Sequence, residues 1–353
     1  MQLSAVVCEN GLGHFKRTLG ILHEWHQRFP EDIIHLFVEQ WQVERLADWD
    51  KIQLLEAPQV HVHTGYVAPG IRLGDVTALT DGRLLNWIKR LEGHPAIRQA
   101  DLVLSDNLSG LLTLRPDTIM LGSFLWSDVF ECLGKEMDCI NQFVSEERRL
   151  LRLYKPPMIC VADIAMPGVL EQTKAVKMPW FAQEPRASRE SKAFSKKVAI
   201  LGGATGLMDD AIKDLAEKLA AHEDWELMLP PNILSSFGLN AGVFGFEQAD
   251  FLAVDLVICR PGIGTITDCI NSQTPMITFS ENGNPEMDHN SMVLEQMGVA
   301  LIVRDGAELI PTLLEISQPE IYQNMLHKLS QLETTGIRDA VDWLISYQSL
   351  KES

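Results

Sequence analysis

The sequence has 353 residues, 46% of them hydrophobic and 22% charged, so we expect a globular protein throughout. This length suits two α/β domains better than a single core. The formal net charge of −18 argues against nucleic acid or an anionic membrane as the main partner. No apolar run is long enough to span a bilayer, and no basic leader precedes the first strand pattern, which predicts a cytoplasmic protein without an integral membrane segment.

The six cysteines show no Cys-x-x-Cys pairing and no clustering with histidine. Cys8 and Cys259 lie in predicted buried strands, where a free thiol behaves as a small apolar group. We therefore expect no structural zinc, no other bound metal and no cofactor.

Apolar runs typical of buried strands alternate with helical periods from the start of the chain. The first part is predicted to contain strands at 2–8, 33–39 and 52–57, and helices at 14–28 and 41–48. Residues 59–78 lack helical periodicity and predict a long surface loop. This alternation is typical of α/β proteins with a parallel sheet.

The pattern continues with a helix at 84–91 and short buried strands at 102–104 and 118–121. From 126 to 153 the pattern is helical, and two prolines at 156 and 157 end it.

The segment 178–196 contains two prolines and a run of polar residues, which favours a linker. The strand, glycine turn and helix pattern starts again after it. We therefore predict an N-terminal Rossmann-like domain at 1–177 and a C-terminal one at 197–353. The last helical stretch, about 338–348, has an apolar face that must be buried against another part of the protein, and one candidate is the N-terminal domain.

Three predicted strands run into glycine turns that open helices, at Gly11 and Gly13, at Gly202 and Gly203, and at Gly262 and Gly264. The third, within 258–268, has the layout of a phosphate cradle, because the free N–H groups and positive dipole end of a helix attract an anion. Residues 1–160 hold 21 acidic and 16 basic residues, and the remainder holds 27 and 14. A diphosphate bound in the second domain would therefore need such local donors.

Taken together, these motifs resemble the two-domain glycosyltransferases of the GT-B fold, and most nearly the MurG-like group, which takes its sugar from a UDP-sugar. The likeness is carried by residues 11–14, 202–203, 243–246, 259–268 and 290–298. It implies two Rossmann-like domains facing across a cleft, with the 178–196 linker allowing closure. It also implies a nucleoside diphosphate sugar as donor and an acceptor that the sequence does not identify.

The resemblance implies a role for individual positions. The cradle residues would donate to the diphosphate, Asp268 would accept from the ribose hydroxyls, residues 244–246 would line the base, and residues 286–290 would contact the sugar. The complete implied nucleotide-sugar set is Gly11, Gly13, Gly202, Gly203, Phe244, Phe246, Arg260, Gly262, Ile263, Gly264, Thr265, Asp268, Glu286, Asp288, His289 and Asn290.

Two positions depart from the family pattern. Met287 stands where relatives commonly have a glutamine that contacts sugar hydroxyls, so the sequence does not predict which sugar the donor carries. The turn at 105–110 also lacks the expected run of glycines, so the acceptor of the family cannot be assigned to this chain.

His14 is the candidate catalytic base, because it follows a glycine turn at the C-terminal end of a strand, where ligands bind in open α/β sheets. A helix-starting histidine bonded to backbone is the alternative. Asp106 ends another strand on the same side, where it would orient His14, bind an acceptor or serve only as a turn residue.

Other candidates also have two interpretations. Arg260 is a phosphate ligand or a surface ion pair. Adjacent residues on a helix do not converge, so Glu286, Asp288 and His289 argue against a metal site. His61 and His63 lie two residues apart in an extended stretch, so their side chains face the same way. They are either substrate contacts or ordinary loop histidines. The apolar residues around Trp126 form core or an exposed face for an acceptor or for peripheral membrane contact, and acidic neighbours disfavour the membrane.

The favoured function is an inverting, metal-independent glycosyltransferase that moves a sugar from a nucleoside diphosphate sugar, by preference a UDP-sugar, to an acceptor hydroxyl. Alternatives are a nucleotide-sugar hydrolase with the same catalytic groups, a sugar 2-epimerase of GT-B shape, and a non-catalytic nucleotide-sugar-binding or partner protein.

Overall fold

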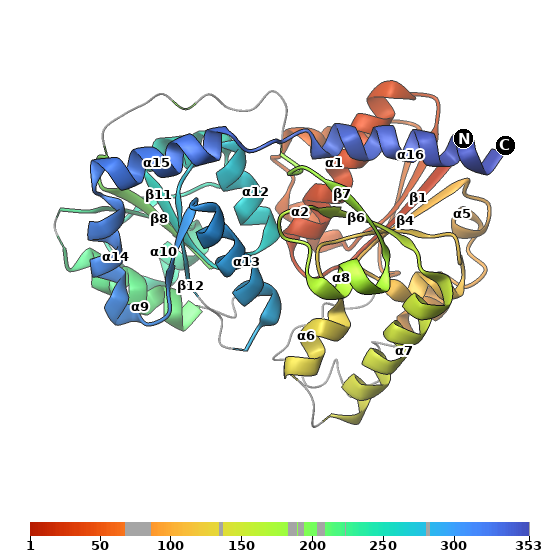
Figure 1. Cartoon of the computed structure of the whole chain (residues 1–353). Helices are drawn as coiled ribbons and strands as arrows, with labels where there is room; N and C mark the ends of the chain where they lie inside the picture. Colours follow the sequence, from red (N-terminus) through yellow and green to blue (C-terminus); the bar gives the residue numbers. More distant parts are fainter. Residues whose placement is uncertain are drawn as a thin grey trace. The chain divides into compact units, whose positions relative to one another are not determined.

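The computed structural model describes residues 1–67, 86–133, 137–182, 189, 194–202, 209–222, 224–279 and 283–352. The chain divides into two compact units (Figure 1). Unit 1 comprises Met1–Phe181 and Thr335–Ser353, and unit 2 comprises Ala182–Thr334.

Unit 1 contains a sheet in the order β3-β2-β1-β4-β5-β6-β7, and every strand pair is parallel. The strands are β1 (Gln2–Val7), β2 (Ile33–Phe37), β3 (Val60–His63), β4 (Leu102–Asp106), β5 (Ile119–Leu121), β6 (Pro157–Val161) and β7 (Lys174–Met178). The central strands are buried along almost their whole length, as expected for a parallel sheet covered on both faces.

Helices and 3₁₀ turns connect these strands. They are α1 (Leu12–Arg28), α2 (Gln40–Arg45), η1 (Asp50–Glu56), η2 (Trp87–Arg90), α5 (Pro95–Arg98), η3 (Ser109–Thr113), α6 (Trp126–Leu133), α7 (Asp138–Tyr154), α8 (Pro167–Gln172) and α16 (Gly336–Glu352).

The last helix, α16, belongs to unit 1 although it follows unit 2 in the chain. It contacts α1 and β7 through an apolar face that includes Ala340, Val341 and Leu344, and Figure 1 shows it in blue beside α1 in red. An ion pair between Lys351 and Asp117, with Nζ 2.6 Å from Oδ2, and another between Arg28 and Asp342 hold its polar side.

Unit 2 repeats the architecture with a parallel sheet in the order β10-β9-β8-β11-β12-β13. Its strands are β8 (Lys197–Leu201), β9 (Glu226–Leu229), β10 (Gly242–Val243), β11 (Leu256–Cys259), β12 (Met276–Phe279) and β13 (Ala300–Val303). Its helices are α9 (Asp209–Ala220), α10 (Pro231–Phe237), α11 (Gln248–Ala253), α12 (Ile263–Asn271), α13 (Pro285–Met297), η4 (Gly306–Glu308), α14 (Leu309–Ile316) and α15 (Pro319–Ser330).

The predicted fold class, two Rossmann-like domains, is confirmed by these two sheets. In each sheet the strand order reverses once, between β1 and β4 in unit 1 and between β8 and β11 in unit 2. Ligands of doubly wound sheets bind outside the carboxyl ends of the strands at such a point. The turns after β1, β4 and β11 are therefore the places to look for a site.

Two predictions near the first edge of unit 1 were wrong. Residues 52–57 do not form a strand but lie in the 3₁₀ helix η1, in which Leu54 alone is fully buried, so the alternating burial of a strand is missing. The predicted loop 59–78 begins with strand β3, whose His61 and His63 pair in register with His35 and Phe37. Residues 68–78 of that prediction lie outside the described residues.

Two helix predictions also change. Of the predicted helix 84–91, the described residues contain the 3₁₀ helix η2. The predicted helical run 126–153 is two helices, α6 and α7, which pack against each other. Each buries its own apolar stripe, so one continuous helix is not needed to cover the sheet.

Candidate active site

The first glycine turn of unit 1 presents His14 at the carboxyl end of β1. Gly11 is the residue before α1, and its φ of 97° lies in the left-handed region that favours glycine. Gly13 and His14 both lie in the first turn of α1, and the His14 side chain is 5% exposed. The tight turn therefore places the imidazole at the switch point of the sheet.

Asp106 ends β4 and faces this helix start, since Val7 of β1 pairs with Asp106 in the sheet register. Its side chain is completely buried. Nδ1 of His14 lies 2.6 Å from Oδ1 of Asp106. Because a carboxylate oxygen accepts, Nδ1 carries the hydrogen and Nε2 keeps a lone pair that can take a proton. The structure thus brings together the two residues predicted as catalytic.

Two further residues of α1 bind the same carboxylate. Arg17 donates from Nη2 to Oδ1 at 2.6 Å and from Nε to Oδ2 at 3.1 Å, and Thr18 donates its hydroxyl to Oδ2 at 2.8 Å. Burial acts to raise the pKa of Asp106, but the charge of Arg17 and the hydrogen bonds from Arg17 and His14 outweigh it and hold the pKa below its usual value. Asp106 is therefore an ionised and fixed partner for His14.

The sequence reasoning did not find Arg17 and Thr18. They stand three and four residues after His14, so all three share one face of the helix. That spacing was the available signal, but it points to Asp106 only once β1 and β4 are known to be neighbours.

The aromatic residues around Trp126 form core rather than an exposed face. Phe124, Trp126, Val129 and Phe130 are each less than 5% exposed. The rings of Phe124 and Trp126 lie with their centroids 6.2 and 6.5 Å from that of His14. Of the two interpretations of these residues, core is confirmed, and an exposed face for an acceptor or a membrane is not.

The histidines of β3 contact other rings instead of standing free in a loop. Nδ1 of His35 lies 3.1 Å from Nε2 of His63, and the His35 ring stacks on that of His61. His94 packs edge-on against His63, with ring centroids 5.0 Å apart. Burial, followed by the mutual repulsion of these rings, lowers the pKa of His35 to about 4 and also lowers that of His63.

In unit 2 the predicted phosphate cradle joins β11 to α12. Gly262 is the residue before the helix and has ordinary extended backbone angles. Ile263, Gly264 and Thr265 form the first helical turn and are partly exposed, and the backbone N–H groups of a first helical turn have no partner within the helix. Asp268 lies one turn further along and is also partly exposed. This arrangement can receive an anion at a helix N-terminus.

Residues of α13 support the cradle from one side. Asn290 is buried and donates its amide to the carbonyl of Pro261 at 2.9 Å, which fixes the turn before Gly262. Met287 is buried, whereas Glu286, Asp288 and His289 are partly exposed. Asn290 thus binds the protein's own backbone, and the other predicted sugar contacts remain on a more accessible face.

The loop predicted to line the base begins with a buried residue. Phe244 packs against Phe251 and Phe246, with centroids 5.0 and 5.4 Å away. Phe246 has a φ of 67° and is 42% exposed. Oδ2 of Asp250 accepts from the N–H groups of residues 245 and 247, both at 3.0 Å, so this loop is held in shape.

The remaining predicted positions are placed as follows. Gly202 is buried directly after β8, and Arg260 is partly exposed directly after β11. Gly203 lies outside the described residues. Within the described part of the chain, no group of three or more His, Cys, Asp or Glu side chains could hold a metal ion.

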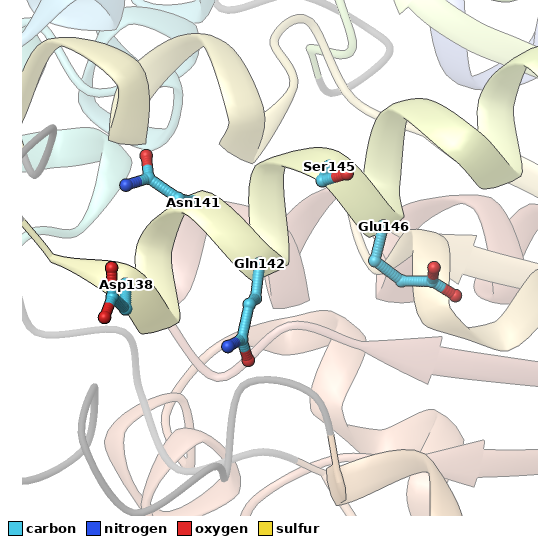
Figure 2. Close-up of a pocket in the computed structure, with 5 residues that line it drawn as sticks. All are labelled: Asp138, Asn141, Gln142, Ser145 and Glu146. Atoms are coloured by element: carbon cyan, nitrogen blue, oxygen red, sulfur yellow. The ribbon is translucent and has the colours of Figure 1, made fainter.

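A shallow hollow of about 630 Å³ runs along the outer face of α7. Figure 2 shows that its lining side chains come from successive turns of this one helix: Asp138, Asn141, Gln142, Ser145 and Glu146. None of these residues was predicted as a site residue. Because they all lie on one face of a single helix, their polar groups do not point toward a common ligand.

None of the helices in the described ranges is both long enough and apolar enough to cross a membrane.

Comparison with known proteins agrees with this architecture. Residues 210–341 match the model of the glycosyltransferase family 28 C-terminal domain. No curated protein sequence matches the chain.

Solved structures with a similar fold cover nearly the whole chain. The glycosyltransferase of kitacinnamycin is 15% identical, with a TM-score of 0.64 and 98% of each chain covered. A UDP-glucosyltransferase from Polygonum tinctorium that glucosylates indoxyl is 12% identical, with a TM-score of 0.69, and the match covers 99% of this chain and 98% of the other. CalG4, the calicheamicin glycosyltransferase, is 10% identical, with a TM-score of 0.64 and the same coverage. These structures show that the chain has the GT-B fold, and its residues 210–341 are similar to the glycosyltransferase family 28 C-terminal domain.

Proposed function

We propose that the chain transfers a sugar from a nucleoside diphosphate sugar, by preference a UDP-sugar, to an acceptor hydroxyl, with inversion at the sugar carbon and without a metal ion. The observation that carries the proposal is the 2.6 Å hydrogen bond between His14 and Asp106 at the switch point of the first sheet. A UDP-glucosyltransferase is among the proteins of similar fold, which favours UDP. The glycine motifs at 11–14 and 259–268 support the finer assignment to the MurG-like group.

Unit 2 is the proposed donor domain. The diphosphate would accept from the backbone N–H groups of Ile263, Gly264 and Thr265, at the positive end of the α12 dipole. The two carboxylate oxygens of Asp268 match two vicinal ribose hydroxyls. The net negative charge of the protein makes such local donors necessary for binding an anion.

Unit 1 is the proposed source of the base. The acceptor hydroxyl attacks the sugar carbon while Nε2 of His14 takes its proton, and Asp106 stabilises the imidazolium that forms. The bond between the sugar and the diphosphate breaks, and the helix dipole and N–H groups of α12 stabilise the charge left on the diphosphate. A single displacement of this kind inverts the configuration and uses one base.

A nucleotide screen tests the donor half of the proposal. UDP, GDP, dTDP, CDP and ADP are each added to the full chain, with and without Mg²⁺, and the melting midpoint is measured. A ligand at about 100 times its dissociation constant adds about 2.7 kcal/mol to the stability of the form that binds it. We expect UDP to raise the midpoint equally with and without Mg²⁺, and no shift with any nucleotide would reject the donor site.

A second assay separates transfer from hydrolysis. UDP release from UDP-glucose is followed with and without candidate acceptors, and the sugar product is identified by mass spectrometry. Transfer predicts a glycosylated acceptor, whereas free sugar as the only product would identify water as the nucleophile.

A further inference from the structure

Gln42 is a polar side chain of α2 that is completely buried beside the turn leading to His14. Its amide nitrogen, Nε2, donates to the carbonyl oxygen of Cys8 at 3.1 Å and to that of Gly11 at 2.9 Å. Its amide oxygen, Oε1, accepts from the backbone N–H of Glu39 at 3.3 Å. A reversed amide would point its oxygen at two carbonyl oxygens, so these three partners fix the orientation of the side chain.

The two carbonyls that Gln42 binds lie at the two ends of this turn. The strand β1 ends at Val7, so the carbonyl of Cys8 lies just beyond the strand, and Gly11 is the residue before α1. Between them the backbone reverses through a bond of 2.9 Å from the N–H of Gly11 to the carbonyl of Glu9. Gln42 therefore fastens the end of the strand to the start of the helix across the turn.

The start of α1 determines where the candidate base lies. His14 stands three residues after Gly11, so a displacement of Gly11 carries the imidazole with it. Nδ1 of His14 lies 2.6 Å from Oδ1 of Asp106, which belongs to another strand, β4. The anchored turn thus sets the imidazole against a partner outside its own helix. A misplacement of about 1 Å at a reacting group can lower a rate about 100-fold.

The helix that carries Gln42 is itself held in place. Glu39 is the residue before α2, and its Oε1 accepts from the backbone N–H of the buried Val67 at 3.2 Å. A residue that supports a functional group must have its own position fixed by packing and hydrogen bonds. Gln42 meets this condition, because it is fully buried and both ends of its amide have partners.

We propose that Gln42 is a positioning residue for the base. By holding the carbonyls of Cys8 and Gly11, it keeps the Nδ1 hydrogen of His14 on Asp106, so that Nε2 keeps the lone pair that takes the acceptor proton. This inference rests on the proposed function, since it concerns the base of the same reaction. A side chain that only fastened α2 to the sheet would affect folding stability and leave the tautomer of His14 unchanged.

Two variants of Gln42 and one matched control test this role in the full chain. Gln42→Met keeps the length of the side chain and removes its hydrogen-bonding groups, whereas Gln42→Glu keeps the shape and the acceptor and removes only the donors. Gln40→Met is the control, because Gln40 is exposed on the same helix and donates to Glu44 at 3.1 Å. Thermal unfolding identifies the variants that fold, and either Gln42 variant suffices. Failure of both to fold would make Gln42 a folding residue and overturn the proposal.

The first measurement is the tautomer of His14 without any substrate. The imidazole nitrogens are labelled with ¹⁵N, the spectrum is recorded at a pH where the ring is neutral, and the His14 signals are those missing from His14→Ala. The wild type and Gln40→Met should hold the proton on Nδ1. In the Gln42 variants the proton should be distributed between Nδ1 and Nε2, because the ring is no longer held on Asp106. An unchanged Nδ1–H form in a folded Gln42 variant would overturn the proposal.

The second measurement is the steady-state release of UDP from UDP-glucose. The kcat should fall about tenfold in a Gln42 variant while UDP affinity stays the same, and it should fall no further when the variant is combined with His14→Ala. An equal fall in both backgrounds would show that Gln42 does not act through His14. If the wild type releases no UDP and the tautomer result stands, only the proposed function is lost, because the tautomer is measured without substrate.

Discussion

Arg17 donates to both carboxylate oxygens of Asp106, at 2.6 Å through Nη2 and at 3.1 Å through Nε, while His14 uses one of the same oxygens. All three side chains are buried. Arg17 therefore keeps Asp106 ionised in a place where burial alone would favour the protonated acid. It also fixes the direction in which Asp106 holds the imidazole.

Replacing Arg17 with methionine is expected to lower the stability of the protein by about 3–5 kcal/mol, because it leaves a buried carboxylate without its cation. Urea unfolding followed by circular dichroism measures the change. Arg149→Met is the control, since Arg149 forms an exposed ion pair with Glu146 and its loss should leave the transition where it is. Equal transitions for the two variants would mean that the Arg17 pair adds nothing.

Asp106→Asn should lower kcat by about 100-fold or more with little effect on KM for the donor, because the amide neither stabilises the imidazolium nor selects the same tautomer. Steady-state kinetics of UDP release provides the comparison. Thr18→Val, which removes only the hydroxyl that donates to Asp106, should cost far less. A wild-type kcat in Asp106→Asn would rule out the dyad.

The histidine cluster at the edge of unit 1 predicts a loss of stability in acid. The pKa of His35 falls to about 4 in the folded protein, chiefly through burial, and that of His63 is lowered for the same reason. Below the ordinary histidine value of about 6.5 the unfolded chain binds more protons, so stability falls as the pH drops from about 6.5 toward 4.

His63→Phe tests the contribution of this cluster, since the phenyl ring can stack on Phe37 as the imidazole does. The midpoint of thermal unfolding should fall less steeply between pH 6.5 and 4.5 in the variant than in the wild type. Parallel curves would show that the cluster does not couple to folding.

Gly262→Ala should separate folding from donor binding. The backbone of Gly262 suits any residue, and the nearest atom to an added Cβ is Nη1 of Arg260 at 3.9 Å. The variant should therefore melt like the wild type, yet bind UDP at least about tenfold more weakly, because the methyl group occupies space next to the phosphate. Isothermal titration calorimetry measures the affinity, and unchanged UDP binding would contradict a cradle at Gly262.

The sequence predicted the parts of the site that depend on local pattern. The strands that precede the turns at Gly11 and Gly262, and the strand that ends at Asp106, could be predicted because buried strands and glycine turns leave local signals. The residues that bind Asp106 could not be predicted, because Arg17 and Thr18 lie next to Asp106 only when β1 and β4 are neighbours in the sheet. The strand at His61 and His63 was missed because its alternation is short and its partner strand lies more than twenty residues away.

The same limit applies to Asn107 and Trp126. Their types and positions suggested a turn and an apolar patch, but the burial of both side chains arises from tertiary packing. Helices α6 and α7 show the same effect, because a single helical period in the sequence divides into two elements that pack on each other.

Comparison of wild type with His14→Ala tests the central claim most directly. UDP affinity is measured by calorimetry on each protein alone, and the steady-state rate of UDP release is measured at saturating UDP-glucose. We predict that the variant binds UDP as tightly as the wild type and releases it at least about 100-fold more slowly. Equal release rates in the two proteins would contradict the assignment of His14 as the base.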